Sequence, residues 1–389
     1  MLNCVPLLGM PTHSTRSPMA RFLLKIPLVL LAAFLVIECY YQLNYGLGAV
    51  IPSFFRVYDF AYIDQSGTPR FPPSLSAWHK SYGDRPDVTV TFNSQGFRGP
   101  EPLASPSVRI AMLGDSMVFN GAVQDDESFP YLIQSSLRQS LHDPGIEVFN
   151  FGVGDIGASK YSLKLANHAV SYRPDLVVVF IYLNDSIEAM SYSKDWARQV
   201  QRPWYRSYTA ENLLKLGRNM HLLYQAQRSE RFNWVESFLS RSYLRDAGAW
   251  EKMVEAARFD WGSAWYEESW GVIEVELAKM RSLAQGQQAE LLLVVLPVKP
   301  QLELPDSTPR LYAPQEFARR AAERLGIPLL DPLQFLRDVR DPDSLMYDQC
   351  HFTVAGNERF AQYLAPHLEE WIKASQAQGT ARSMRRLRE

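Results

Sequence analysis

The sequence predicts an α/β fold, a three-layer α/β/α sandwich in which helices cover both faces of a parallel β-sheet. Two observations support this prediction. From Val108 onward, short apolar runs alternate with segments whose apolar residues recur at helical spacing. The run Leu176–Tyr182 (LVVVFIY) is apolar throughout and rich in β-branched residues, which is typical of a parallel strand buried on both faces.

The composition is that of a folded chain without a nucleic-acid partner. Of the 389 residues, 47% are hydrophobic and 21% are charged, which is enough for a packed core and excludes a wholly disordered or collagen-like protein. The formal net charge of −2 provides no basic footprint for nucleic acid. The three cysteines, Cys4, Cys39 and Cys350, are too few and too scattered for a disulfide framework or a zinc knuckle.

An apolar segment near the N-terminus predicts a membrane anchor over residues 22–41. No charged residue lies between Lys25 and Glu38. About 18 or 19 helical residues cover roughly 27–29 Å, close to the thickness of a hydrocarbon core of about 30 Å. The residues before Lys25 include Arg16 and Arg21 but no acid, so the positive-inside rule places them in the cytoplasm.

A cleaved signal peptide fits this segment less well than an anchor does. It needs small residues at its cleavage site, which Glu38-Cys39-Tyr40-Tyr41 does not supply. The bulky, charged Glu38 also disfavours a lipoprotein site at Cys39, and a buried core helix is the remaining alternative. We expect a cytoplasmic tail over residues 1–21 and an uncleaved signal anchor. The protein would then be a single-pass inner-membrane protein whose remaining chain lies in the periplasm.

Residues 42–104, which follow the anchor, are rich in proline, glycine and aromatic residues. The alternating run Val88–Phe92 predicts a half-buried strand, and the sequence NSQGFRG at Asn93–Gly99 predicts a turn. We interpret the whole segment as a stalk that packs onto the main domain.

Five apolar runs and four amphipathic segments make up the main domain, over residues 105–375. The predicted strands are Val108–Leu113, Ile146–Phe151, Leu176–Tyr182, Glu290–Leu296 and Ile327–Leu330. The predicted helices are Phe129–Leu141, Leu163–Val170, Pro314–Leu325 and a terminal helix over Val354–Ala374. A basic, solvated tail over residues 376–389 ends the chain.

One stretch, residues 191–270, interrupts the alternation because it contains helical pattern and charge but no convincing strand. Seven of the nine tryptophans fall in it. We interpret it as a helical insertion, since loops after the strands of such sheets are where ligand sites are built. Its tryptophans either pack the insertion onto the body of the domain, or line a substrate cleft or touch the membrane surface.

A serine follows the first strand, in the sequence Gly114-Asp115-Ser116. Open α/β sheets hold their ligands at this carboxyl edge. A serine becomes a nucleophile only when a neighbouring base takes its proton. Asp348 and His351, three residues apart in a loop before the terminal helix, can supply that base and its orienting carboxylate. This is the arrangement of a Ser-His-Asp triad, in the chain order Ser, Asp, His.

Three hydrogen-bond donors can stabilise the oxyanion that such a triad generates. The run Leu176–Tyr182 leads into Asn184, whose amide would lie at the carboxyl edge of the sheet. The second strand leads into a turn with Gly152 and Gly154, whose N–H groups can approach a ligand closely. The N–H of Ser116 is the third candidate.

Taken in chain order, these motifs resemble those of the SGNH (GDSL) hydrolases over roughly residues 106–374: Gly-Asp-Ser, a glycine turn, Asn-Asp and Asp-x-x-His. The resemblance implies a flavodoxin-like sandwich and acyl-ester hydrolysis without a metal or cofactor. It also implies a role for each site residue: Ser116 as nucleophile, His351 as base, Asp348 as its orienting partner, and Ser116 N–H, Gly154 and Asn184 as the oxyanion hole.

Two positions depart from the family pattern. Leu183 stands before the Asn-Asp pair, where the family often has glycine. Asp155 stands where many relatives have the glycine of the second motif, so we assign the donor to Gly154 and keep Gly152 as the alternative. A carboxylate close to an oxyanion is unfavourable, which makes a catalytically inactive, membrane-tethered scaffold one alternative function.

A second alternative is a dinucleotide site, because Gly152-Val-Gly154-Asp-Ile-Gly157 fits the G-x-G-x-x-G fingerprint. The acid expected about 20 residues later is Asp175, but it precedes the next strand instead of ending it. We therefore favour a serine esterase whose substrate is an acyl ester of an envelope or secreted glycan or lipid. The same triad can pass an acyl group to a sugar hydroxyl, so an O-acetyltransferase is a third alternative.

Overall fold

The computed structural model describes most of the chain. The described residues are 18–46, 62–64, 66–71, 73–74, 76–79, 88–154, 156–185, 187, 209, 230 and 233–386. They belong to two compact units. Helix α1 and residue 209 belong to the first unit, and all other described residues belong to the second.

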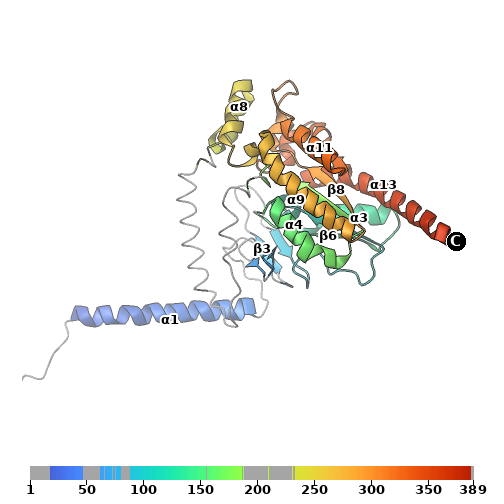
Figure 1. The fold of residues 1–389 in the computed structure, drawn as a ribbon. Coiled ribbons are helices and arrows are strands. Elements are labelled where there is room, and N and C mark those ends of the chain that lie inside the picture. The colour runs from blue at the N-terminus through green and yellow to red at the C-terminus, as the bar shows by residue number, and fades with distance from the viewer. Residues whose placement is uncertain are drawn as a thin grey trace, which may run out of the picture. The chain divides into compact units, whose positions relative to one another are not determined.

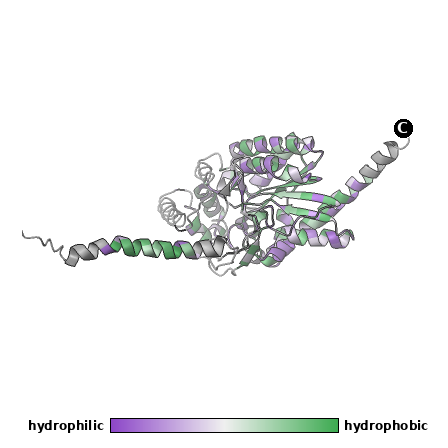
Figure 2. Cartoon of the chain, turned by 90° about the horizontal axis from the view of Figure 1, so that it is seen from below, coloured by the Kyte–Doolittle hydropathy of each residue, from purple (hydrophilic) through white to green (hydrophobic). Residues whose placement is uncertain are grey.

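The described residues of the first unit are helix α1 (Pro18–Gly46), which is 29 residues long, and residue 209. The middle of this helix is hydrophobic (Figure 2), and many of its apolar residues are exposed, including Leu28 at 66% and Val36 at 69%. Among the described residues, no helix is both long and apolar enough to cross a membrane. The predicted transmembrane anchor over residues 22–41 is therefore not supported by this structure.

A five-stranded parallel sheet forms the centre of the second unit (Figure 1). Its strands in chain order are β5 (Val108–Leu113), β6 (Ile146–Asn150), β7 (Leu176–Ile181), β8 (Glu290–Val295) and β9 (Leu329–Leu330). Their order across the sheet is β6-β5-β7-β8-β9, which is the flavodoxin-like order. All six residues of β7 are buried, as the apolar run predicts. The parallel-sheet α/β fold is thus confirmed.

Helices lie on both sides of the sheet (Figures 1 and 2). The helices that connect or follow the strands are α3 (Phe129–Ser140), α4 (Ala158–Asn167), α9 (Glu267–Gly286), α11 (Ala313–Leu325) and α13 (Val354–Arg386). The step from β5 to β6 runs across the sheet in the opposite direction from all later steps. Right-handed crossovers therefore place α3 on one face and α4, α9 and α11 on the other. Accordingly, α3 packs against α13, and α9 packs against α4 and α11.

Shorter elements connect these helices and strands. They are α2 (Ser116–Phe119), η2 (Asp125–Glu127), η3 (Ala169–Tyr172), α7 (Val235–Leu239), η6 (Ser242–Leu244), α8 (Ala247–Ala256), η7 (Trp261–Trp265), α10 (Lys299–Glu303), α12 (Leu333–Arg337) and η8 (Pro342–Leu345).

The terminal helix is longer than predicted. The sequence predicts a helix ending at Ala374 and a separate solvated tail, whereas α13 continues to Arg386. The added residues are mostly Ala, Gln, Arg and Met, which are good helix formers, and they contain no proline.

The segment before the sheet forms two small antiparallel pairs within the same unit. β1 (Tyr62–Ile63) pairs with β2 (Pro69–Arg70), and β3 (Ser76–His79) pairs with β4 (Val88–Thr91). β4 alternates between buried and exposed residues, as its sequence predicts. The buried side chains of this segment, among them Phe71 and Phe92, join the same hydrophobic core as the five-stranded sheet.

The described part of the predicted insertion, from residue 233, contains short helices and no strand. Its five tryptophans are each at most 4% exposed; they are Trp234, Trp250, Trp261, Trp265 and Trp270. Several of their rings meet edge to face. These five side chains therefore pack into the core, and Trp250 and Trp265 also line a pocket together with Tyr266 and Arg310. Trp196 and Trp204 lie outside the described residues.

Candidate active site

Ser116 stands at the start of a one-turn helix that directly follows the first strand of the domain. The carboxylate of Asp115 caps this helix, α2, by accepting the N–H of Met117 at 2.8 Å. Gly114 makes the turn possible, since a Cβ there would lie 2.3 Å from the Val118 side chain. The strand-to-helix turn thus presents a half-buried Ser116 at the carboxyl edge of the sheet.

His351 and Asp348 lie in the loop between η8 and α13. Two bonds from Lys299 tether this loop: its N–H donates to the carbonyl of Gln349 at 2.8 Å, and its Nζ to that of Met346 at 2.9 Å. Oδ1 of Asp348 also accepts the backbone N–H of His351 at 2.8 Å. The carboxylate therefore shapes the loop as well as facing the imidazole.

The structure brings Ser116, His351 and Asp348 together, although 235 residues separate the serine from the histidine. Nε2 of His351 lies 2.9 Å from Oγ of Ser116, and Nδ1 lies 2.9 Å from Oδ2 of Asp348. The carboxylate selects the tautomer with the proton on Nδ1, so Nε2 carries the lone pair that can accept the serine proton. The side chains of His351 and Asp348 are each 22% exposed, so the group is accessible from solvent.

The three predicted oxyanion donors follow three neighbouring strands. Ser116 comes after β5, Gly154 after β6 and Asn184 after β7, and β5 lies between the other two strands. Within the described part of the chain, the N–H groups of Ser116 and Gly154 and the amide of Asn184 have no hydrogen-bond acceptor. Asp185 holds the turn around Asn184, because its carboxylate accepts the N–H of Tyr182 at 3.0 Å and the hydroxyl of Tyr161 at 2.8 Å.

Gly152, the alternative donor, has a different role. Its N–H is already bonded to Oδ1 of Asn150 at 2.9 Å. A Cβ at Gly152 would lie 2.1 Å from the backbone nitrogen of Phe119, so the glycine allows the turn after β6 to pack directly on α2. These contacts favour Gly154 as the donor from this turn; its neighbour Asp155 lies outside the described residues.

The positions of Asp175 and the glycine turn contradict the dinucleotide alternative. Asp175, the acid that would bind the ribose, accepts the N–H of Arg109 at 2.8 Å at the amino ends of β5 and β7. The glycine turn lies at the opposite, carboxyl edge of the same sheet. One ligand cannot bind both edges in the way that the fingerprint requires.

One group of described residues could hold a metal ion, because its potential ligand atoms all lie within 4.8 Å of one another. The group consists of Asp348, Cys350 and His351. Cys350 is buried, and its Sγ lies 3.4 Å from Nδ1 of His351. Both ring nitrogens of His351 already contact triad partners, Nε2 facing Ser116 and Nδ1 facing Asp348. The arrangement of the imidazole therefore suits proton transfer. Burial raises the pKa of Tyr182 well above its usual value, and the negative charges of nearby groups, Asp348 among them, add to the shift.

Comparison with known proteins identifies the family. The model of the GDSL-like lipase/acylhydrolase family matches residues 112–359, which include the triad and the three donors. The chain belongs to this family. It is accordingly a carboxylic ester hydrolase. A search of curated proteins found no match.

Several solved structures are similar to this chain. One is TesA, with 14% identity over 67% of this chain and 97% of TesA, and a TM-score of 0.39. Another is a mutant of Axe2, an acetylxylan esterase from Geobacillus stearothermophilus, with 12% identity over 68% and 94% of the two chains and a TM-score of 0.39. A lipase/acylhydrolase from Enterococcus faecalis has 11% identity over 68% and 96%, and a TM-score of 0.36.

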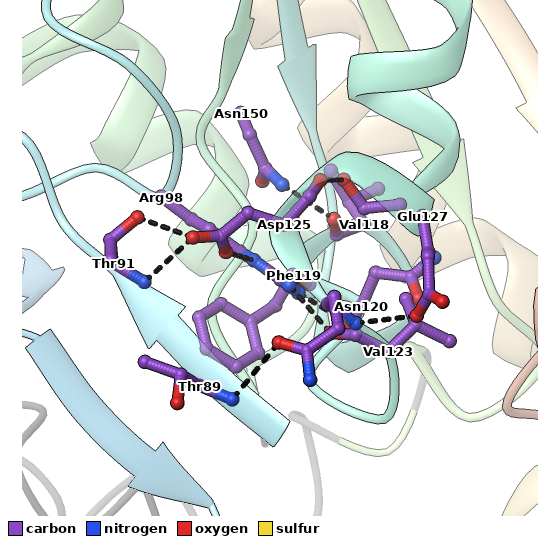
Figure 3. Close-up of polar contacts among 12 residues, drawn as sticks. Thr89, Thr91, Arg98, Val118, Phe119, Asn120, Val123, Asp125, Glu127 and Asn150 are labelled. Carbon is purple, nitrogen blue, oxygen red and sulfur yellow. Dashed lines mark hydrogen bonds and ion pairs between the residues drawn. The ribbon is translucent and has the colours of Figure 1, made fainter.

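Two residues beside the hydrolase site have roles that the sequence analysis missed. The amide of Asn150 donates to the carbonyl of Val118 at 2.9 Å and thereby ties the glycine turn to α2 (Figure 3). Arg98, which the sequence places only in a turn, inserts a buried guanidinium behind α2. An isolated arginine in a glycine-containing turn usually lies in solvent, so the sequence holds no local signal for this contact.

Proposed function

We propose that this hydrolase cleaves acyl esters with Ser116 as nucleophile, His351 as general base and Asp348 as the residue that orients the imidazole. The observation that carries the proposal is the continuous chain of contacts from Oγ of Ser116 through the imidazole to the Asp348 carboxylate, with both contacts at 2.9 Å. These distances lie within the range required for proton transfer.

In the proposed reaction, Oγ attacks the ester carbonyl while Nε2 of His351 takes the serine proton. The Nδ1–H of the resulting imidazolium stays bonded to Asp348, which stabilises the positive charge. The oxyanion accepts hydrogen bonds from Ser116 N–H, Gly154 N–H and the Asn184 amide. His351 then protonates the leaving alcohol, and an activated water releases the acid by the same steps in reverse order.

We further propose that the hydrolase is tethered by α1 and acts outside the cytoplasm on an acyl ester of a glycan or a lipid. The exposed apolar side chains of α1 support the tether. Leu28, Val29 and Leu30 are each about two-thirds exposed, and placing such surface in lipid instead of water is favourable by about 25 cal/mol per Å².

Turnover of p-nitrophenyl acetate by the full chain tests the proposed nucleophile. We expect Ser116→Ala to lose nearly all activity, because the base alone accounts for about 10²–10⁴ in rate and has no hydroxyl to activate in the variant. Ser107→Ala is the matched control, since this serine precedes the same strand at its amino end and bonds to Asp143. Near-normal turnover in Ser116→Ala would refute the proposal.

Product analysis on acetylated glycans and phospholipids tests the substrate and the type of reaction. Release of free acid supports hydrolysis, whereas transfer of the acyl group to an added sugar would identify an acyltransferase instead. If every acetylated glycan and phospholipid is left unchanged while p-nitrophenyl acetate is cleaved, the proposed substrate class is wrong.

Membrane extraction tests the tether. We expect the full chain to stay with membranes in alkaline carbonate and to be released by detergent. Exogenous protease should reach the hydrolase domain only after the outer face of the cytoplasmic membrane is exposed. Release of the full chain by carbonate would contradict the tether.

A further inference from the structure

We propose that Arg98 is a positioning residue for Ser116, supplied by the segment that precedes the hydrolase domain. The proposal rests on the proposed role of Ser116 as nucleophile. Arg98 lies outside residues 112–359, the part of the chain that matches the family. The side chain that supports the site thus comes from the segment before the matched part of the chain.

The guanidinium of Arg98 binds the end of α2 and the turn that follows (Figure 3). Nη1 donates to the carbonyl of Phe119 at 2.8 Å and also to that of Asn120, and Nη2 donates to the carbonyl of Val123 at 2.7 Å. The side chain is only 2% exposed. A buried charge with this many directed bonds holds its acceptors in one fixed arrangement.

These acceptors lie close to the nucleophile because α2 has only four residues, Ser116–Phe119. A single helical turn has little stability of its own, and its last carbonyls lack partners within the helix. Arg98 supplies a partner for the last of them, the carbonyl of Phe119, and for the Asn120 and Val123 carbonyls just beyond the helix. It also places positive charge at the helix C-terminus, where it is favourable. Ser116 begins α2 and Phe119 ends it, so the bond from Arg98 to the Phe119 carbonyl helps to fix the position of Ser116.

The same turn is bonded to the segment that carries the histidine. The side chain of Asn120 exchanges hydrogen bonds with that of Asn357, and both side chains are buried. Asn357 lies in the first turn of α13, just after His351, and its N–H donates to the carbonyl of Thr353 at 2.9 Å. Holding the Asn120 carbonyl therefore also holds the link between the serine and histidine segments.

Arg98 is itself held in place from two sides. Its Nε donates to Oδ1 of Asp125 at 2.8 Å (Figure 3). The same carboxylate is fixed by the N–H of Thr91 in β4, which donates to Oδ2 of Asp125 at 3.0 Å. The backbone of Arg98 forms an antiparallel bridge with Asn150 at the end of β6. Arg98 thus connects the stalk, the glycine turn and α2, which are the elements around Ser116.

Steady-state kinetics of the full chain with p-nitrophenyl acetate test the proposal. We expect Arg98→Met to lower kcat by about 10- to 100-fold, as a displacement of the nucleophile by roughly 1 Å would. KM should change by less than about threefold, since no substrate contact is removed. The rate of fluorophosphonate labelling should fall with kcat, and Arg98→Lys should recover part of both.

Arg359→Met is the matched control. Arg359 also donates to main-chain carbonyls at the end of a short helix, those of Phe335 at 2.9 Å and Asp338 at 3.1 Å. Its removal should lower the melting temperature without a comparable loss of kcat. All rates are compared at a temperature at which circular dichroism shows each variant to be folded, and Arg98→Lys carries the test if Arg98→Met does not fold.

The possible outcomes separate this proposal from the proposed function. If the folded Arg98 variants label and turn over like wild type, or no more slowly than Arg359→Met, the positioning role is wrong while the triad stands. If wild type is not labelled on Ser116, the proposed function itself fails.

Discussion

At the scale of single residues, the imidazole of His351 lies between Oγ of Ser116 and Oδ2 of Asp348. The Asp348 carboxylate also fixes the shape of the loop that carries the histidine. Asp348 accepts backbone N–H groups of the loop through Oδ1 and faces Nδ1 with Oδ2. An asparagine can keep the first function while placing an amide against Nδ1. Substituting Asp348 by asparagine therefore separates two functions of the carboxylate: shaping the loop, and fixing the proton of His351 on Nδ1.

We expect Asp348→Asn to lower kcat by about 10²–10⁴ because the amide favours the wrong tautomer of His351. Its melting temperature should stay close to that of wild type. Asp175→Asn is the control, since that carboxylate also accepts a backbone N–H but lies at the amino edge of the sheet. Kinetics and thermal melts of the two variants are the measurement, and equal kcat in both would contradict the assignment.

The amide of Asn184 permits a separate test of the oxyanion hole. We expect Asn184→Ala to lower kcat by about 10²–10³ with little change in KM, because a donor that acts mainly in the transition state is lost. Asn167→Ala removes an amide that donates to Thr68 at 2.8 Å, at the end of α4, and should leave kcat unchanged. A kcat for Asn184→Ala equal to that of Asn167→Ala would remove the amide from the mechanism.

At the scale of elements, the site depends on how closely the turn after β6 packs on α2. We expect Gly152→Ala to lower both stability and activity, because its Cβ would lie 2.1 Å from the Phe119 nitrogen. Gly271→Ala is the control: it lies in α9, and a Cβ there meets nothing within 4 Å. That change should raise the free energy of unfolding by about 0.5–1 kcal/mol. Denaturant titrations measure both effects, and an unchanged Gly152→Ala would contradict the close packing.

The strands and the four motifs could be predicted because each has a local cause. A continuous apolar run such as that of β7 is visible in the sequence, and each polar motif follows directly after a strand or precedes the terminal helix. The role of Arg98 could not be predicted, since its acceptors are backbone carbonyls more than 20 residues away. The length of α13 was missed for a related reason, because a helix without an apolar face has no periodic signal.

At the scale of the whole molecule, the stalk and the hydrolase domain share a buried cationic contact. The Nζ of Lys164 in α4 donates to the carbonyl of Pro69 at 2.8 Å, and the side chain is 1% exposed. Burial, together with the nearby charge of Arg70, lowers the pKa of Lys164 to about 7, while Asp64 opposes the shift. The unfolded chain therefore binds this proton more tightly than the folded protein does.

The sign of the effect follows from that difference. Below about pH 7 the lysine is charged in both states, and its burial costs the full penalty; between about pH 7 and 10.5 the folded protein loses the proton and the penalty fades. We expect Lys164→Met to raise the free energy of unfolding at pH 6, by about 5 kcal/mol at most, less the lost bond to Pro69. The gain should shrink towards pH 9. Lys279→Met, at an exposed lysine, should show no such trend in urea titrations at the two pH values.

The identity of the nucleophile is tested most directly by locating the covalent adduct of a fluorophosphonate on the full chain by peptide mass spectrometry. We expect one adduct, on the peptide that carries Ser116. It should be absent in Ser116→Ala and nearly absent in His351→Ala, because the hydroxyl is then missing or not activated. An adduct on another residue, or labelling undiminished in Ser116→Ala, would contradict the catalytic site described above.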